Sequence, residues 1–289
     1  MKDPREILKK VRQIEIRTRK MVTDVMAGHY NSVFKGQGMD FEDVRSYNPG
    51  DDIRSIDWNV TARMGDAYVK RFREERELTL MLVVDVSASG DFGSQEESKR
   101  EMMAEMASVM AFSAIRNNDK VGLLLFTDQV EAFIPPQKGR QHVLRIIREL
   151  LFFEPKSSGT DIKVALDYLN RIVKRKAVTF VVSDFLVRDT FRQARIRNQY
   201  TGMYKALSLT DRRHDLIVIR LSDPREYNLS NVGILTLEDA ETGQLVEINT
   251  RNKRVRAEYE ARNTRQLEDF KGSLKRLGID SIYVENGQP

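Results

Sequence analysis

Oxygen-bearing side chains follow an apolar run in the first half of the chain. The run 80–84, Leu-Met-Leu-Val-Val, leads directly into Asp85, Ser87 and Ser89, which together form the pattern Asp-x-Ser-x-Ser. An apolar run of this length bounded by polar residues predicts a strand that is covered on both faces. A carboxylate and two hydroxyls offer only oxygen ligands, which hard cations such as Mg²⁺ prefer. The pattern therefore predicts a hard-cation site at the end of this strand and disfavours soft metals.

Two further polar residues stand downstream at similar places. Thr160 follows Gly159 and opens the helix expected over 161–174, and Asp184 follows the strand expected over 178–182. Each residue lies where a regular element begins or ends. Three loops are thus available to carry one site, although Asp85 and Ser87 alone are also explained as caps of a following helix.

The five residues, in this order, resemble the metal-ion-dependent adhesion site of von Willebrand factor A domains. That site combines Asp-x-Ser-x-Ser with a distant threonine and a distant aspartate. The resemblance implies that Asp85, Ser87, Ser89 and Thr160 bind a divalent cation directly and that Asp184 binds it directly or from the next shell. The expected ion is Mg²⁺, with Mn²⁺ or Ca²⁺ as alternatives. Because the ligands neutralise the cation only partly, a Glu or Asp of a partner protein would complete its coordination.

Two other functions remain open at this point. A Mg²⁺-dependent phosphoester hydrolase would use an aspartate at a strand end, but such folds need a second acid two residues later, where this chain has Ser87. A structural scaffold with a vestigial metal site is the other alternative. No phosphate-binding loop or dinucleotide fingerprint is present in the sequence. A protein without enzymatic activity is therefore expected.

Composition narrows the class of protein further. The 289 residues contain no cysteine, which excludes disulfides, thiolate zinc sites and a cysteine nucleophile. The net charge of +5 arises from interleaved acids and bases, and the basic clusters lack the aromatic residues of single-strand binders, so no nucleic acid partner is expected. No apolar stretch reaches the roughly 20 residues that span a bilayer. We expect a cytoplasmic protein, with a peripheral contact to a membrane protein left open.

The order of apolar runs and amphipathic stretches predicts the fold. From residue 78 onward strands alternate with helices, which is typical of an α/β domain whose mostly parallel sheet carries helices on both faces. We expect this von Willebrand factor A-like domain over 78–289, with a β-hairpin insertion near 232–250. The helix expected over 96–117 would turn Met102, Met106, Val109, Met110 and Ser113 inward. Residues 1–77 would add a helix over 4–26 and a charged, irregular segment packed on the domain.

The segment Tyr47–Arg63 within this extension admits two interpretations. In the favoured one it is a structural collar of Asp/Arg ion pairs in which Trp58, the single tryptophan, fills the core. In the other it is a docking face for a partner.

The stretch from Phe41 to Ser89 also resembles a bacterial family catalogued as domain of unknown function number fifty-eight. The resemblance rests on the sequence Asp43 to Arg54, on Ile56-Asp57-Trp58, on Thr61-Ala62-Arg63 and on Glu74 to Glu77 before the apolar run. It implies a MoxR-type AAA+ ATPase as partner. This chain would then act as an adaptor or substrate selector in protein maturation or assembly, and would contact its client protein through an acidic residue of that client.

Overall fold

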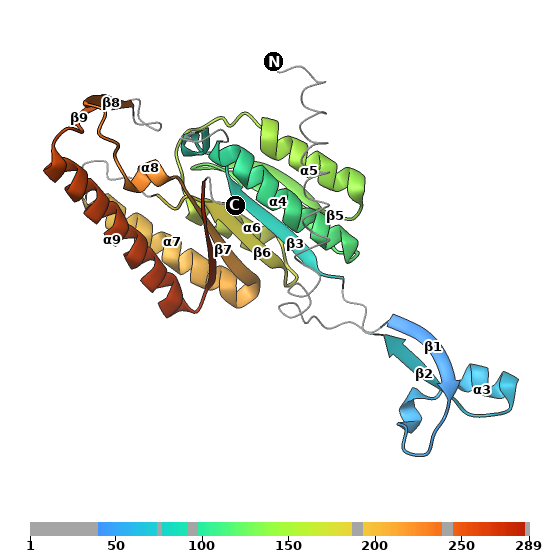
Figure 1. The fold of residues 1–289 in the computed structure, drawn as a ribbon. Helices are drawn as coiled ribbons and strands as arrows, with labels where there is room; N and C mark the ends of the chain where they lie inside the picture. The colour runs from blue at the N-terminus through green and yellow to red at the C-terminus, as the bar shows by residue number, and fades with distance from the viewer. Residues whose placement is uncertain (1–39, 74–76, 92–97, 187–192, 239–244, 287–289) are drawn as a thin grey trace. The chain divides into compact units, whose positions relative to one another are not determined.

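A computed structural model describes residues 40–73, 77–91, 98–186, 193–238 and 245–286 (Figure 1). The chain divides into two compact units, of which the smaller ends at Leu78 and the larger continues from Thr79. The helix expected over 4–26 lies outside the described residues. The expected packing of the N-terminal segment on the main domain stays a prediction.

The larger unit is built on a six-stranded sheet with the order β10-β7-β6-β3-β4-β5. Its strands are β3 (Thr79–Asp85), β4 (Lys120–Phe126), β5 (Val130–Gln137), β6 (Val178–Ser183), β7 (Asp215–Ser222) and β10 (Asp280–Glu285). All neighbouring pairs run parallel except β4 and β5. Because β3 and β6 lie in the middle of the sheet, their side chains are buried on both faces, as the apolar runs predicted.

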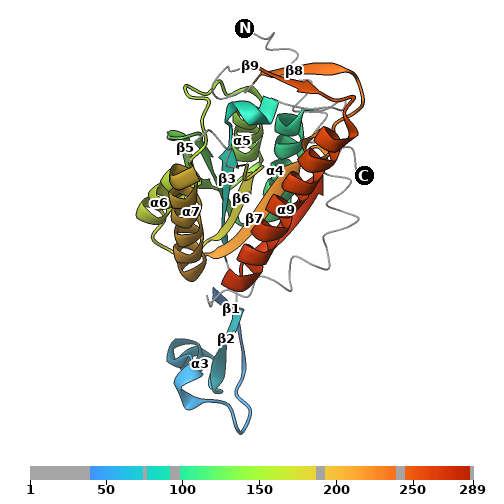
Figure 2. The ribbon, with the colours of Figure 1, turned by 90° about the vertical axis from the view of Figure 1, so that its left-hand side faces the viewer.

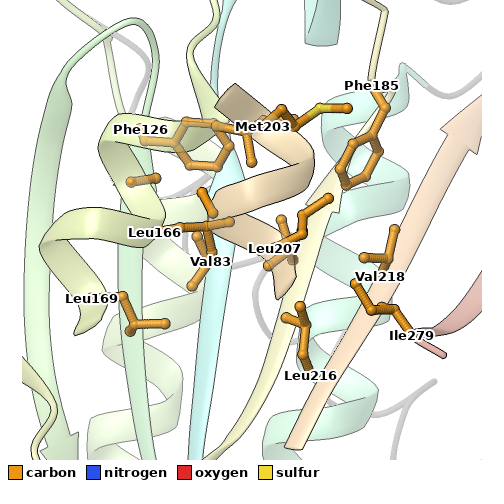
Figure 3. Close-up of a cluster of buried hydrophobic side chains, with 14 of the residues drawn as sticks. Val83, Phe126, Leu166, Leu169, Phe185, Met203, Leu207, Leu216, Val218 and Ile279 are labelled. Atoms are coloured by element: carbon orange, nitrogen blue, oxygen red, sulfur yellow. The ribbon is translucent and has the colours of Figure 1, made fainter. Parts of the chain in front are cut away.

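Helices cover both faces of this sheet (Figures 1 and 2). They are α4 (Lys99–Arg116), α5 (Arg140–Phe152), α6 (Ile162–Ile172), α7 (Gln193–Arg213) and α9 (Lys253–Leu277). On one face, side chains of α6, α7 and α9 pack in a single apolar cluster with Val83 of β3 and Val218 of β7 (Figure 3). Alternate residues of β3 point to the opposite face, where α4 and α5 pack together. The predicted fold class is confirmed.

Two details of the helices differ from expectation. The buried face of α4 carries Met103, Ala107 and Ala114, so it is rotated by about one residue from the predicted face. Three residues that were expected to point inward are only partly buried, namely Met102, Met106 and Val109. Ser113 and Met110 are buried as predicted. Helix α7 was not predicted; its buried residues combine two large apolar side chains, Met203 and Leu207, with the short or polar Ala206 and Thr210.

The smaller unit is more regular than the predicted irregular segment. Strands β1 (Asp40–Ser46) and β2 (Tyr68–Arg73) form an antiparallel pair, joined through the 3₁₀ helix η1 (Ile53–Ser55) and the short helix α3 (Trp58–Met64). Asp57 caps α3 by accepting hydrogen bonds from the amides of Asn59 and Val60. The expected core position of Trp58 is wrong, because its side chain is 65 % exposed at the first position of α3.

An insertion follows β7. It contains the short helix α8 (Pro224–Tyr227) and the antiparallel strands β8 (Ile234–Glu238) and β9 (Leu245–Asn249), which form the hairpin expected near 232–250. The turn of this hairpin lies outside the described residues. Within the described part of the chain, no helix is long and apolar enough to cross a membrane.

Candidate metal centre

The carboxyl ends of β3 and β6 meet because the two strands are parallel neighbours. Asp85 ends β3 and is 3 % exposed. Its Oδ1 accepts a hydrogen bond from the amide of Ser87 at 2.9 Å, and its Oδ2 accepts one from the hydroxyl of Ser183, the last residue of β6, at 2.7 Å. Two strand ends therefore hold one carboxylate in a fixed orientation.

The other predicted ligands of the first and third loops lie beside Asp85. The Ser87 and Ser89 hydroxyl oxygens are 3.1 Å apart, and both residues are buried. Ser89 also hydrogen-bonds the side chain of Asp184. Asp85, Ser87, Ser89 and Asp184, which are up to 99 positions apart in sequence, thus form one continuous buried polar group.

The backbone turns sharply directly after Asp184. Phe185 has a φ of 52°, in the left-handed region that a bulky side chain adopts only under constraint. Its amide donates to the Ser183 hydroxyl at 3.0 Å, and its buried ring packs on Phe270 with centroids 5.0 Å apart. The amide of Leu186 donates to Oδ1 of Asp184 at 3.1 Å. Packing and hydrogen bonds together fix the turn that presents Asp184.

Thr160 lies on the neighbouring loop and is partly buried. This loop is joined to the first one by a hydrogen bond from the Ala88 amide to the Ser158 carbonyl, at 3.3 Å. Glu131 of β5 holds the same loop, because its Oε1 accepts from the amides of Lys156 and Ser157 at 3.2 and 3.1 Å. The structure thus brings the Thr160 loop next to the Asp85 loop. The next residue, Asp161, is the N-cap of α6, and its side chain accepts from the amide of Lys163.

Lys99 is the charged residue that the sequence analysis missed at this site. It is the first residue of α4 and is 1 % exposed. Its Nζ lies 3.1 Å from Oδ2 of Asp184 and also pairs with Glu226 of α8. Lys99 lies one helical turn before Met103 and so belongs to the buried face of α4. Had the predicted buried face included Met103, it would also have included Lys99.

The electrostatics of the site follow from burial and from these pairings. Burial and the neighbouring charge of Asp184 raise the pKa of Asp85 to about 7. Burial also opposes ionisation of Asp184, but Lys99 and the Leu186 amide outweigh it and hold the pKa of Asp184 below its ordinary value. For Glu226 burial dominates and raises the pKa.

These observations fit a divalent cation bound at the strand ends. With all groups ionised, the three carboxylates of Asp85, Asp184 and Glu226 and the ammonium of Lys99 leave a formal charge of −2. Burial is the main cause of the raised pKa of Asp85 and the charge of Asp184 adds to it, so a cation bound next to this carboxylate would favour its ionised form. Across the described ranges, no three His, Cys, Asp or Glu side chains gather as a metal site. Binding here would depend on two carboxylates together with hydroxyl oxygens, which suits a hard cation.

Comparison with known proteins relates the chain to uncharacterized relatives. It is 30 % identical over 241 residues to the uncharacterized protein Rv1480 of Mycobacterium tuberculosis, which covers 83 % of this chain and 72 % of the relative. It is 28 % identical over 153 residues to the uncharacterized protein YeaD of Bacillus subtilis, which covers 53 % of this chain and 36 % of the relative.

Solved structures show more distant likenesses. The conserved hypothetical protein BatB of Bacteroides thetaiotaomicron has a TM-score of 0.44 at 15 % identity, over 73 % of this chain and 91 % of that one. Proximal thread matrix protein 1 of the mussel byssus, whose structure has a zinc-occupied MIDAS motif, has a TM-score of 0.37 at 14 % identity, over 50 % of this chain and 38 % of that one. At these values neither protein's function transfers to this chain.

One family matches most of the chain, from residue 43 to residue 269. The matched region includes the Tyr47–Arg63 segment, the Asp85 loop, Thr160 and Asp184. The match agrees with the resemblance that the sequence of residues 41–89 had indicated. The chain therefore belongs to the family described as "Protein of unknown function DUF58".

Proposed function

We propose that this chain is a non-enzymatic protein-binding module that holds a divalent cation, Mg²⁺ in the first instance, at the ends of β3 and β6. Asp85, Ser87, Ser89 and Thr160 would be its direct ligands, and Asp184 a direct or water-mediated one. The observation that supports this most is the buried group in which Asp85, Ser87, Ser89 and Asp184 are joined although they lie on separate loops. Helix capping explains the position of one loop and leaves the other unexplained.

The ligand chemistry suggests what such an ion would bind. Hydroxyl ligands carry no charge, so a divalent ion in this site keeps affinity for an additional anionic oxygen. A Glu or Asp side chain of a client protein supplies this oxygen. The MoxR-type AAA+ ATPase is the second proposed partner, for which the chain would act as adaptor or substrate selector. This part of the proposal rests on the family resemblance alone.

Two binding experiments test the proposal in sequence. In the first, metal-stripped protein is titrated with Mg²⁺ and Mn²⁺, with Asp167→Ala as a control because Asp167 is an exposed acid that pairs with Lys163 on α6. Saturable binding in wild type and control, lost in Asp85→Ala, is expected. In the second, the purified ATPase of the same organism is tested for co-elution with and without Mg²⁺. If Asp85→Ala co-elutes with the ATPase as well as the wild type does, the bound ion has no role in this contact.

Turnover distinguishes the module from the hydrolase alternative. A Mg²⁺-dependent release of phosphate from a generic phosphoester, abolished in Asp85→Asn, would overturn the non-enzymatic assignment. The absence of any divalent binding in the wild type would favour the structural scaffold.

A further inference from the structure

Lys99 is a buried lysine whose ammonium pairs with Asp184, one of the proposed metal ligands. Of the lysines that the structure describes, it is the one with a fully buried side chain. Among the described residues it pairs with two acids from different elements, since Asp184 follows β6 and Glu226 belongs to α8. Burial of an ammonium ion is strongly unfavourable unless it is well paired. Two carboxylates meet that requirement and hold the pKa of Lys99 above its ordinary value despite burial.

The position of this ammonium bears directly on the proposed ion. Asp184 shares its Oδ2 with Lys99, while its Oδ1 accepts from the amide of Leu186. Among the described residues, a cation near Asp85 therefore meets one carboxylate that makes no ion pair, Asp85, and one already paired with an ammonium, Asp184. Glu226 pairs with the same ammonium, so the positive charge of Lys99 is shared between two carboxylates.

We propose that Lys99 is a positioning residue that sets the charge of the metal centre. It keeps Asp184 in place, limits the affinity of the site for a divalent cation, and so leaves the bound ion electron-poor enough to accept a partner's carboxylate. Glu226, which pairs with the same ammonium, balances this effect. The inference rests on the proposed function, because it concerns the same ion.

Charge-changing variants separate this role from a purely structural one. Lys99→Gln shifts the formal charge from −2 to −3, and Glu226→Gln shifts it to −1. One unit charge within a few ångströms of a divalent ion, at the effective dielectric of protein interiors, changes affinity by about tenfold or more. We expect Mg²⁺ to bind at least about tenfold more tightly to Lys99→Gln and about tenfold more weakly to Glu226→Gln. The double variant restores the formal charge of −2 and should return close to wild-type affinity.

The experiment is calorimetric titration of five metal-stripped proteins with Mg²⁺, after circular dichroism has shown that each is folded. They are the wild type, Lys99→Gln, Glu226→Gln, the double variant and Lys99→Arg. Each protein, saturated with Mg²⁺, is then titrated with glutarate as the carboxylate probe. Lys99→Gln should bind glutarate more weakly than wild type, and Lys99→Arg should resemble wild type in both titrations.

Several outcomes would overturn the inference, and they differ from a failure of the proposed function. If both single variants weaken Mg²⁺ binding and the double variant weakens it further, Lys99 is only structural. If Lys99→Gln does not fold, the decision rests on the double variant, where wild-type affinity supports the charge-setting role and weaker affinity contradicts it. If the wild type binds no Mg²⁺, the proposed function itself fails.

Discussion

Removal of the Ser183 hydroxyl should destabilise the larger unit far more than removal of a comparable buried hydroxyl elsewhere. Ser183 is fully buried, and its Oγ donates to Asp85 at 2.7 Å while accepting from the Phe185 amide at 3.0 Å. Ser183→Ala deletes a hydrogen bond to a charged group, which contributes about 1.5–3 kcal/mol, and leaves a buried amide without that acceptor. We expect the free energy of unfolding to fall by about 3 kcal/mol, roughly a hundredfold in the folding equilibrium.

Ser108 provides the matched control for this prediction. It is also fully buried, but its hydroxyl donates to the carbonyl of Ala104 within α4, and alanine is the better helix former. Ser108→Ala should therefore cost less than about 1 kcal/mol. Urea unfolding of metal-stripped protein is followed by far-ultraviolet circular dichroism, at pH values well above the pKa of about 7 of Asp85. Equal losses in the two variants would refute the claim that Ser183 fixes the Asp85 carboxylate.

Three further predictions concern other parts of the molecule. Glu131→Ala should increase hydrogen exchange at the amides of Lys156 and Ser157 and weaken Mg²⁺ binding several-fold, because Glu131 accepts from both amides; unchanged exchange would contradict this. Burial and the nearby Arg213 lower the pKa of His214 in the folded protein. Below about pH 6.5 the unfolded state therefore binds more protons than the folded state, and the free energy of unfolding decreases as the pH is lowered. The stability difference between wild type and His214→Gln should shrink by up to about 1.4 kcal/mol per pH unit in that range, and a constant difference would be inconsistent with it. Trp58 should show fluorescence that acrylamide quenches strongly, and Trp58→Phe should change stability by less than about 0.5 kcal/mol, since the indole is exposed; a shielded indole would contradict the structure.

The elements with strong apolar patterns were predictable. Helix α6 agrees with the helix expected over 161–174 to within two residues at each end, and the buried strands β3 and β6 agree to within a residue at each end. The same strands place Asp85 and Asp184 at their ends, so most of the candidate site followed from local pattern and from the neighbourhood of parallel strands.

The remaining features depend on contacts that the sequence does not encode locally. The burial of Lys99 depends on the phase of α4 and on two acids more than 80 positions away. Methionines on adjacent positions of α4 made two phases of that helix look equally apolar, which concealed the lysine. The exposure of Trp58 could not be predicted from composition, because a tryptophan is more often buried. Its position at the start of α3 is set by the cap at Asp57.

The central claim is that Asp85 and its neighbours hold a divalent cation, and isothermal titration tests it most directly. Metal-stripped wild type, Asp85→Ala, Thr160→Ala and the control Asp167→Ala are titrated with Mg²⁺ and with Mn²⁺. We predict single-site binding in the wild type and the control and its loss in the other two variants. Divalent binding that persists unchanged in Asp85→Ala, or no binding in the wild type, would contradict the account.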